Sequence, residues 1–386
     1  MELQQALPTP RVSTGMAFYL RKLMTFNFAI HDYRTNRGYM FVWDEVTANR
    51  GAAEIISCIN QFIAEQVPAH VNKLYMFSDN CAGQNKNIYL NMFYLSMSNS
   101  GRFKEITHIY FRPGHTFMSA DRDFALFEKK MRKTPWIFTP DEHIALIKST
   151  RRPGCVGYPS TVHKMKQEEF FEYDQKQYQS DLITNRKIRG CRFVDACYFK
   201  FSDQYRIGYE VSNSYGPLLD PNWQATRVRL NKGKDNPSNN SQFTLHQNIP
   251  RKYHTLIPLS NEKLKDIRKL VEALVPRLVQ EEYWNAIIGT CDIANGNEDN
   301  LDEQVEDEGL YEQPGDVVLN EQQQPDSEAL PEDPGVNDLD DQSGDEDWDE
   351  TSSDEEPDMQ SRDEASDELT PSYRDYFAPN NFYDYS

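Results

Sequence analysis

Two apolar segments of this chain each end in a polar turn that leads into a helical pattern. The first, from Leu74 to Phe77, is followed by SDNCAGQNKN at residues 78–87. The second, from Ile106 to Phe111, is followed by PGHTFMSAD at residues 113–121. A short apolar run bounded by turn residues predicts a buried strand. Strands that alternate with helices in this way restrict the chain to an α/β fold.

Each of these turns carries an acid close to the point where a strand ends or a helix begins. The two acids are Asp79 and Asp121. Ligands of open α/β sheets bind beside such strand ends, and carboxylate oxygens bind Mg²⁺ or Mn²⁺ while leaving positions for water and phosphate oxygens. Taken singly, each acid is better explained as a turn residue or a helix cap. Taken together and in this order, they favour a metal site for phosphodiester chemistry.

The neighbouring patterns predict a mixed sheet flanked by helices. With residues 2–7 as a first strand, the order of elements over residues 1–150 is that of a ribonuclease H-like fold. We expect a hairpin over 23–30 and 38–46, strands over 74–78 and 106–111, and helices over 51–66, 87–97, 121–133 and 140–147.

The remainder of the chain is predicted to form an extension and a tail. Over residues 151–287 we expect a helix at 166–179, a small β-rich unit at 187–230 and two C-terminal helices that begin at Ser260 and Pro276. Residues 288–386 are mostly Asp, Glu, Gln, Ser and Pro. Such a segment buries too little apolar surface to offset its ordering entropy. We therefore expect a disordered acidic tail, whose aromatic end is a candidate segment for binding a protein partner.

The charge of the chain is divided unevenly. Residues 291–386 hold 33 Asp and Glu against Arg362 and Arg374, a net charge of −31, whereas residues 1–290 have a net charge of +11. A basic body favours a polyanionic partner, which we expect to be DNA rather than RNA. The exposed basic end of a helix is the structural alternative for part of this charge. The candidate contacts to a nucleic-acid backbone are Lys86, Lys129, Lys130, Arg132, Lys133, Arg151 and Arg152.

The cysteines and the apolar runs indicate where in the cell this chain is expected. The six cysteines form no CxxC pair and no zinc-type cluster, which indicates a reduced, intracellular chain. No apolar run is long enough to span a bilayer, and the first residues lack the pattern of a signal peptide. We expect no membrane or secretory role, and the basic run 129–133 is typical of a nuclear import signal.

Four segments together resemble a known family. The two turns, the sequence Trp43-Asp44-Glu45 and the RGAAEIISC segment at 50–58 are similar to the marks of an uncharacterised domain family of transposon-derived proteins. That family is marked by SDNCxGQNKN and PGHTxxxxD. The resemblance covers about residues 2–285. It implies a ribonuclease H-like fold of the transposase and integrase type, in which three acids bind two Mg²⁺ or Mn²⁺ ions.

The resemblance also implies roles for particular acids. Asp79 and Asp121 correspond to the second and third acids of the family. Glu2 stands where the family carries its first acid, an Asp. His115 lies close in sequence to the third acid, where an imidazole can orient a water, bind phosphate or ligate a metal. A buried histidine bonded to a turn is the alternative for this residue.

Other polar residues near the two turns are weaker candidates. Asp123 and Glu128 lie in the same predicted helix as the third acid and are alternative ligands. Asp44 and Glu45 end a predicted strand and are candidate outer ligands, although a solvated strand end explains them better. Cys81 is better explained as a packed thiol than as a nucleophile.

The sequence therefore predicts a transposase-derived domain in which metal ions activate water or a 3′-hydroxyl for attack on a phosphodiester. The alternative is a catalytically silent relative that binds DNA or chromatin proteins. A scaffold that does not act on nucleic acid is the third possibility.

Overall fold

A long antiparallel hairpin forms the centre of the fold. In a computed structural model of the chain, strand β5 (Arg37–Asp44) pairs along its whole length with residues 25–32 of β4 (Leu23–Asp32). In the turn, Asn36 has a φ of 52°, a value that Asn tolerates better than most residues. This hairpin is the one that the sequence predicts. The structure describes residues 1–112, 118–174, 187–188, 191–206, 208–216, 220, 223–229 and 249–302, which all belong to one compact unit, Met1–Glu306.

Three shorter strands complete the sheet around the hairpin. β1 (Glu2–Leu3) and β2 (Leu7–Thr9) both pair antiparallel with β4, and β9 (Thr161–Lys164) pairs parallel with β5. The first strand, expected over residues 2–7, is therefore two short strands. The main-chain nitrogen of Met1 donates to the carbonyl oxygen of Phe77, 2.7 Å away. This bond places the start of β1 beside the end of a strand of the second sheet.

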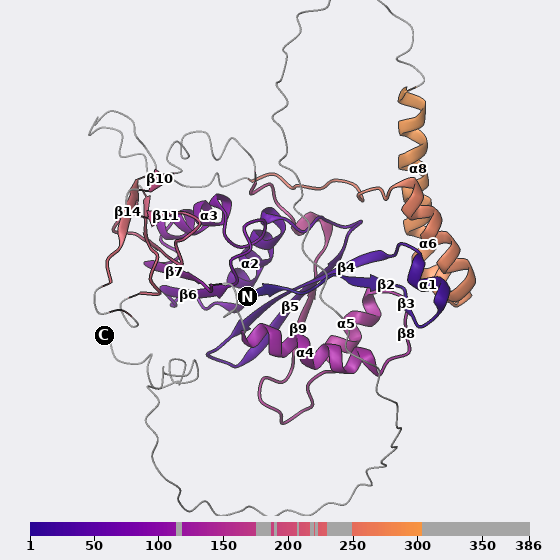
Figure 1. Cartoon of the computed structure of the whole chain (residues 1–386), viewed down its shortest axis with the longest axis horizontal. Coiled ribbons are helices and arrows are strands. Elements are labelled where there is room, and N and C mark those ends of the chain that lie inside the picture. The colour runs from indigo at the N-terminus through magenta and orange to yellow at the C-terminus, as the bar shows by residue number, and fades with distance from the viewer. Residues whose placement is uncertain are drawn as a thin grey trace, which may run out of the picture. The chain divides into compact units, whose positions relative to one another are not determined.

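The side chains of the hairpin point alternately towards two helical layers. Phe28 and Phe41 lie in a core that they share with α2 and α3, whereas Ala29 and Val42 lie in another core with α4 and α5. This period of two follows from the pleat of a strand. Figure 1 shows α2 and α3 on one side of β4 and β5, and α4 and α5 on the other. These four helices, all predicted from the sequence, are α2 (Ala52–Gln66), α3 (Ile88–Asn99), α4 (Ser119–Arg132) and α5 (Pro140–Lys148).

The second sheet joins parts of the chain that the sequence analysis separates. Its strands, in spatial order, are β14 (Thr226–Arg229), β13 (Gly208–Ser212), β12 (Tyr198–Ser202), β7 (Glu105–Tyr110) and β6 (Lys73–Ser78). β6 and β7 are parallel, with α3 as their crossover, and β12 pairs antiparallel with β7. The sequence predicts a separate β-rich unit over 187–230, whereas β12, β13 and β14 extend the sheet of the core. Phe199 and Phe201 are fully buried in that core, which explains why these strands do not form their own unit.

A helix expected over residues 166–179 is not present in the described part of that segment. A 3-10 turn, η1 (Gln167–Glu169), is followed by an isolated bridge between Phe171 and Arg251. The main-chain nitrogen of Phe171 donates to Ser57 Oγ, 3.1 Å away. Because Phe170 is fully buried in the main core, tertiary packing and these bonds override the local helical pattern. Residues 175–179 lie outside the described residues.

The C-terminal helices pack on the edge of the hairpin. Trp284 is fully buried in a cluster with Leu23, Val46 and Ile267. The predicted start of the tail at residue 288 falls inside the last of these helices, because Ile287 and Cys291 are buried in the same cluster. No helix in the described ranges has the length and apolar content needed to cross a bilayer. These elements are α6 (Asn261–Leu274), α7 (Arg277–Val279), the π-helical turn η3 (Gln280–Trp284) and α8 (Asn285–Asp302).

Five further short elements lie in the described part of the unit. β3 (Arg11–Val12) pairs with β8 (Trp136–Ile137), and α1 (Gly15–Tyr19) packs beside α6 through Ala17. β10 (Lys187–Ile188) and β11 (Cys191–Arg192) form a separate two-stranded ladder.

Replacement of Trp284 by Ala tests whether the C-terminal helices belong to the folded core. We expect Trp284→Ala to lower the free energy of unfolding by about 3–5 kcal/mol, because it leaves a large cavity between α6, η3 and the hairpin. Leu278→Ala is the matched control, since Leu278 is 64% exposed and such surface changes cost within about 0.5 kcal/mol. Urea unfolding measures both. Equal stabilities of the two variants would contradict the packing described above.

Candidate functional site

Three acids from distant parts of the sequence come together at one place. Glu2 lies on β1, Asp79 directly follows the last residue of β6, and Asp121 lies in the first turn of α4. Burial, followed by a side-chain hydrogen bond with Asp121 and the negative charges of Asp121 and Asp79, raises the pKa of Glu2 to about 8. A carboxyl group with this pKa holds a proton at neutral pH, and that proton bridges Glu2 and Asp121.

The turn after β6 holds Asp79 in place. Asn85 Nδ2 donates to Asp79 Oδ1, 2.5 Å away, and the main-chain nitrogen of Asn85 donates to the carbonyl oxygen of Cys81. Tyr110, at the end of β7, donates its hydroxyl hydrogen to the carbonyl oxygen of Asn85 at 2.9 Å. The turn after β6 is therefore hydrogen-bonded to the end of β7 as well. The side-chain amide of Asn85 has a structural role, because it determines where the carboxylate of Asp79 lies.

Asp121 combines a capping role with membership of the acid cluster. Its Oδ2 accepts a hydrogen bond from the main-chain nitrogen of Met118, 2.6 Å away, at the start of α4. A carboxylate at this position is also stabilised by the helix dipole. The capping explanation for Asp121 is therefore correct, and it does not exclude a second role, because the same side chain contacts Glu2.

The donor atoms of this acid cluster suit Mg²⁺ or Mn²⁺. All three groups supply carboxylate oxygens, which these hard cations prefer. Glu2 Oε2 and Asn85 Oδ1 are buried and have no hydrogen-bond partner, so two acceptor atoms remain for a cation or a water. In the described part of the chain, however, no three His, Cys, Asp or Glu side chains stand in a ready-made ligand arrangement. A cation would have to displace the proton that Glu2 shares with Asp121.

Asp123 and Glu128 have other partners. Asp123 is buried, its Oδ2 lies 2.7 Å from His31 Nδ1, and its Oδ1 pairs with the guanidinium of Arg151. Both carboxylate oxygens of Asp123 are thus occupied. Glu128 accepts a hydrogen bond from Gln4 Nε2 at 3.0 Å. The structure therefore gives both alternative ligands structural roles.

Asp44 and Glu45 stabilise the fold at the end of β5. Asp44 Oδ1 accepts from the main-chain nitrogen and the hydroxyl of Thr47, and its Oδ2 accepts from the hydroxyl of Tyr283. Glu45 accepts from the main-chain nitrogen of Met24 and pairs with Lys263 of α6. The outer-ligand prediction for these two acids finds no support, and they are more than a solvated strand end. His115 lies outside the described residues.

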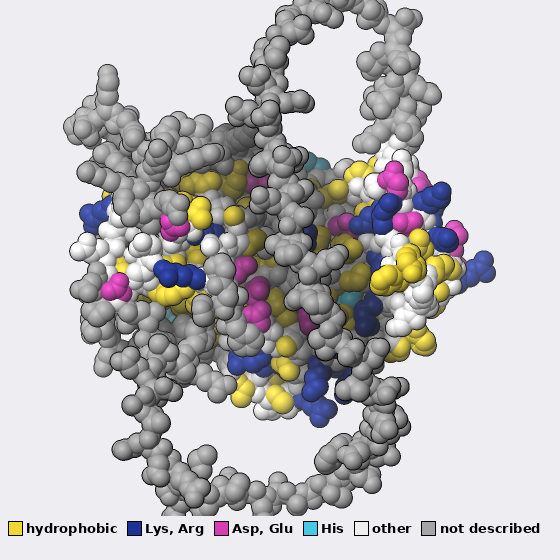
Figure 2. All heavy atoms as spheres, in the orientation of Figure 1, with side chains coloured by type: hydrophobic (Ala, Val, Ile, Leu, Met, Phe, Trp, Pro, Cys, Tyr) yellow, Lys and Arg dark blue, Asp and Glu magenta, His cyan; other side chains and the backbone are white. Residues whose placement is uncertain are grey.

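The predicted nucleic-acid contacts divide into an exposed group and a buried group. Arg151 pairs with Asp123, and Lys86 is only 5% exposed and donates to the carbonyl oxygen of Val194 at 2.6 Å. Lys130 is half-buried and donates to the carbonyl oxygen of Ser149 at 2.7 Å. Figure 2 shows Lys and Arg side chains gathered over the region of α4. The exposed members of the predicted set are Lys129, Arg132, Lys133 and Arg152.

Sequence reasoning missed several residues next to the acid cluster. Arg112, Asp195 and Cys197 line a cavity together with Asn80 and Lys86. Arg112 lies two residues beyond the end of β7, and Asp79 directly follows the parallel strand β6, so the position of Arg112 near a strand end is a signal that could have identified it. Nothing in the sequence indicates Asp195 and Cys197, since their approach depends on the pairing of β12 with β7.

Part of the chain matches a family of domains whose function is unknown. Residues 29–202 match the family described as a domain of unknown function (DUF7869). The matched segment begins within β4 and ends with β12, so it contains Asp79 and Asp121 but not Glu2. No curated protein and no solved structure matches the chain.

Replacement of Glu2 by Gln tests the acid cluster through its pH dependence. The pKa of Glu2 is raised from its ordinary value of 4.5 to about 8, so the unfolded chain loses this proton first and stability falls between these two pH values. We expect Glu2→Gln to match the wild type near pH 5 and to melt several degrees higher near pH 9, by about 2–4 °C for each kcal/mol of relieved repulsion.

Thermal unfolding between pH 5 and pH 9 measures this difference. Glu281→Gln is the control, because Glu281 is an exposed residue of the C-terminal π-helical turn. Parallel curves for wild type and Glu2→Gln across this range would contradict the shared proton.

Proposed function

We propose that this chain is a ribonuclease H-like domain of the transposase type that cleaves or joins phosphodiester bonds, with Glu2, Asp79 and Asp121 as the ligands of Mg²⁺ or Mn²⁺. The observation that carries the proposal is the hydrogen bond from the Met1 nitrogen to the carbonyl oxygen of Phe77, which brings Glu2 on β1 beside Asp79 at the end of β6. The raised pKa of Glu2 agrees with this convergence of carboxyl groups. Three acids from separate elements that repel one another are costly for a fold. Such clusters are typical of functional sites.

The arrangement of the strands supports this proposal. β1 lies between β4, with which it pairs, and the end of β6, which it contacts through Met1. β6 and β7 continue in parallel on the far side, and helices cover both faces of the hairpin. An acid on the first strand, an acid on the fourth strand and an acid at the last helix are what the family resemblance implies.

The residues of the chain have distinct tasks in this proposal. Glu2 holds a proton in contact with Asp121 and gives it up when a cation binds. Asn85 orients Asp79, and the main chain at Met118 orients Asp121. A bound divalent ion polarises the phosphate and lowers the pKa of a bound water. The exposed Lys129 and Lys133 at the end of α4 attract the backbone of a nucleic acid, which we propose to be DNA in the nucleus.

The single substitutions Asp79→Asn and Asp121→Asn test the proposal. Each keeps an oxygen that can accept the bond from Asn85 or Met118 but removes the charge that holds a cation. We expect Mn²⁺ to raise the melting temperature of the wild type by mass action and to leave both variants unchanged. We expect Mn²⁺-dependent cleavage of a DNA oligonucleotide to fall by about a hundredfold or more.

A further variant and a control distinguish metal ligation by Asp121 from its capping of α4. Asp121→Ala removes the cap as well as the charge and should cost about 1 kcal/mol more in stability than Asp121→Asn. Asp141→Asn, at an exposed acid of α5, should behave as the wild type. Retention of Mn²⁺ stabilisation by both Asn variants would rule out the ligand assignment.

A catalytically silent relative that binds DNA is the second candidate. It is favoured by the fact that no three acidic, His or Cys side chains among the described residues form a ready-made ligand group. Binding of DNA that requires Lys129 and Lys133, with no Mn²⁺ stabilisation and no cleavage, would select this candidate over the first.

A further inference from the structure

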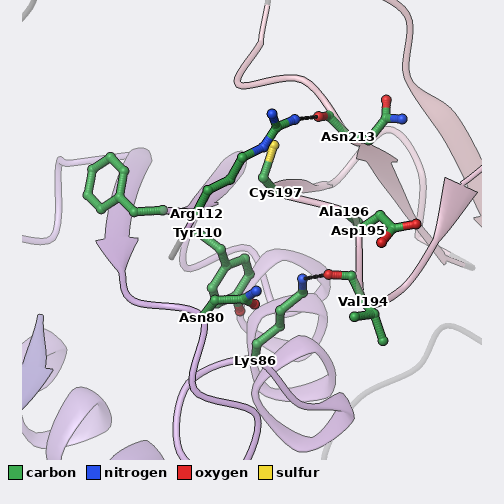
Figure 3. A pocket seen from close by; sticks show the side chains of 10 residues that line it. Asn80, Lys86, Tyr110, Arg112, Val194, Asp195, Ala196, Cys197 and Asn213 are labelled. Carbon is green, nitrogen blue, oxygen red and sulfur yellow. Dashed lines mark hydrogen bonds between the residues drawn. The ribbon is translucent and has the colours of Figure 1, made fainter. Parts of the chain in front are cut away.

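A polar cavity opens beside the turn that carries Asp79. Its volume is about 400 Å³, within the range of small-molecule sites, about 300–1,000 Å³. The walls come from the turn after β6, the end of β7, the segment before β12 and the end of β13. Figure 3 shows Asn80 and Lys86 on one side and Asp195 on the other, with Arg112 reaching past Cys197 to Asn213.

Lys86 provides a buried positive charge on the wall of this cavity. Its side chain is 5% exposed. Its Nζ donates to the carbonyl oxygen of Val194 at 2.6 Å and lies 5.7 Å from the ring centroid of Tyr110 and 5.9 Å from that of Phe193. A lysine is rarely buried, because desolvation of its ammonium group is costly. Carbonyl and ring faces hold this ammonium group in one place beside the open space.

Arg112 adds a second cation at the same wall. One of its Nη atoms donates to the carbonyl oxygen of Asn213 at 2.8 Å, and its guanidinium lies 5.7 Å from the ring centroid of Tyr215. Figure 3 shows the guanidinium beside the sulfur of Cys197. Arginine has five N–H donors in a planar fork, so these contacts fix its orientation and leave donors for a ligand. The residue is exposed to solvent.

The lining as a whole favours an anion with several oxygens. Among the described lining residues two cations stand against one carboxylate, that of Asp195, and the side-chain amides of Asn80 and Asn213 add neutral donors. Lys and Arg together bind phosphate well, since Lys acts as a point charge and Arg as a fork of parallel donors. The cavity is larger than a phosphate group alone, which leaves room for an attached sugar.

We propose that this cavity binds a phosphate group of a nucleotide or of a nucleic-acid strand, with Lys86 and Arg112 as its cationic donors and Asn80 as a neutral donor. Asn80 directly follows Asp79, so the site lies next to the acid cluster. The inference rests on the proposed function for its choice of phosphate over other anions. Its role there is to hold a phosphate adjacent to the one that reacts.

The test measures binding without metal, so that it does not depend on catalysis. Inorganic phosphate, thymidine 5′-monophosphate and a single-stranded DNA octamer are titrated into the full chain by calorimetry in the presence of EDTA. We expect the nucleotide to bind the wild type and Arg112→Gln to weaken this binding about tenfold or more, the effect of losing one hydrogen bond to a charged group. Lys86→Met, which keeps the apolar stem, should weaken it similarly.

Arg34→Gln is the matched control, because Arg34 is an arginine in the β4–β5 turn whose side chain is 63% exposed. Arg34→Gln should bind as the wild type. Loss of octamer binding in parallel with nucleotide binding assigns the site to a strand phosphate, and loss of nucleotide binding alone assigns it to a free nucleotide. Equal affinities of wild type and Arg112→Gln for phosphate and nucleotide would overturn the proposal, and so would the absence of binding to the wild type.

The same titrations separate this inference from the proposed function. Asp79→Asn should keep nucleotide binding in EDTA, whatever its effect on cleavage. Nucleotide binding that depends on Arg112, in a chain that neither binds Mn²⁺ nor cleaves DNA, would support phosphate binding in the cavity and contradict the proposed nuclease function. DNA cleavage by a chain in which Arg112→Gln leaves the binding of phosphate and nucleotide unchanged would reject phosphate binding in the cavity and support the nuclease.

Discussion

The burial of β4 and β5 on both faces is the constraint on which the rest of this structure depends. A slip of one residue in their pairing would exchange the side chains of the two cores, so the register is strongly specified. β1 takes its position from β4, through Glu2 opposite Ala29 and through a hydrogen bond from Asn27 Nδ2 to Gln4 Oε1 at 3.0 Å. The location of the first acid is therefore a consequence of hydrophobic packing in the hairpin.

The acid cluster and the cavity next to it have opposite electrostatic character. At the cluster, carboxyl groups crowd together and one of them retains a proton. At the cavity, a buried ammonium group and a guanidinium are held by carbonyl oxygens and aromatic rings. The turn after β6 separates the two, with Asp79 on one side and Asn80 on the other. The proposed metal site and the proposed phosphate site adjoin each other, which would suit a phosphate-containing ligand whose negative charge is neutralised by bound metal ions.

Local sequence patterns were enough to predict most of the regular elements, but not the side-chain partners. Helices α2 and α6 carry apolar residues about 3.6 positions apart, whereas α3 and the hairpin are apolar on most sides and were predicted from their composition and the turns beside them. The segments where prediction failed are those in which distant contacts decide. Phe170 is buried in the main core, so its segment does not form a surface helix. Phe199 and Phe201 are buried in the same core, and their strand β12 pairs with β7 of the second sheet. Likewise, the sequence marks Asp79 and Asp121, but not that Asn85 and Met118 would be their partners, because hydrogen-bond partners depend on the shape of each turn.

The packing of Trp284 against Leu23 and Val46 has a consequence for how the parts of the chain depend on one another. The segment that matches a family begins after Leu23 and ends before the C-terminal helices. It therefore lacks β1, β2 and the helices that cover one edge of the hairpin, and would leave Val46 without most of its neighbours. The region recognisable by sequence is smaller than the region that must fold together. Amide exchange at the centre of β4 should accordingly report on the integrity of α6 and α8.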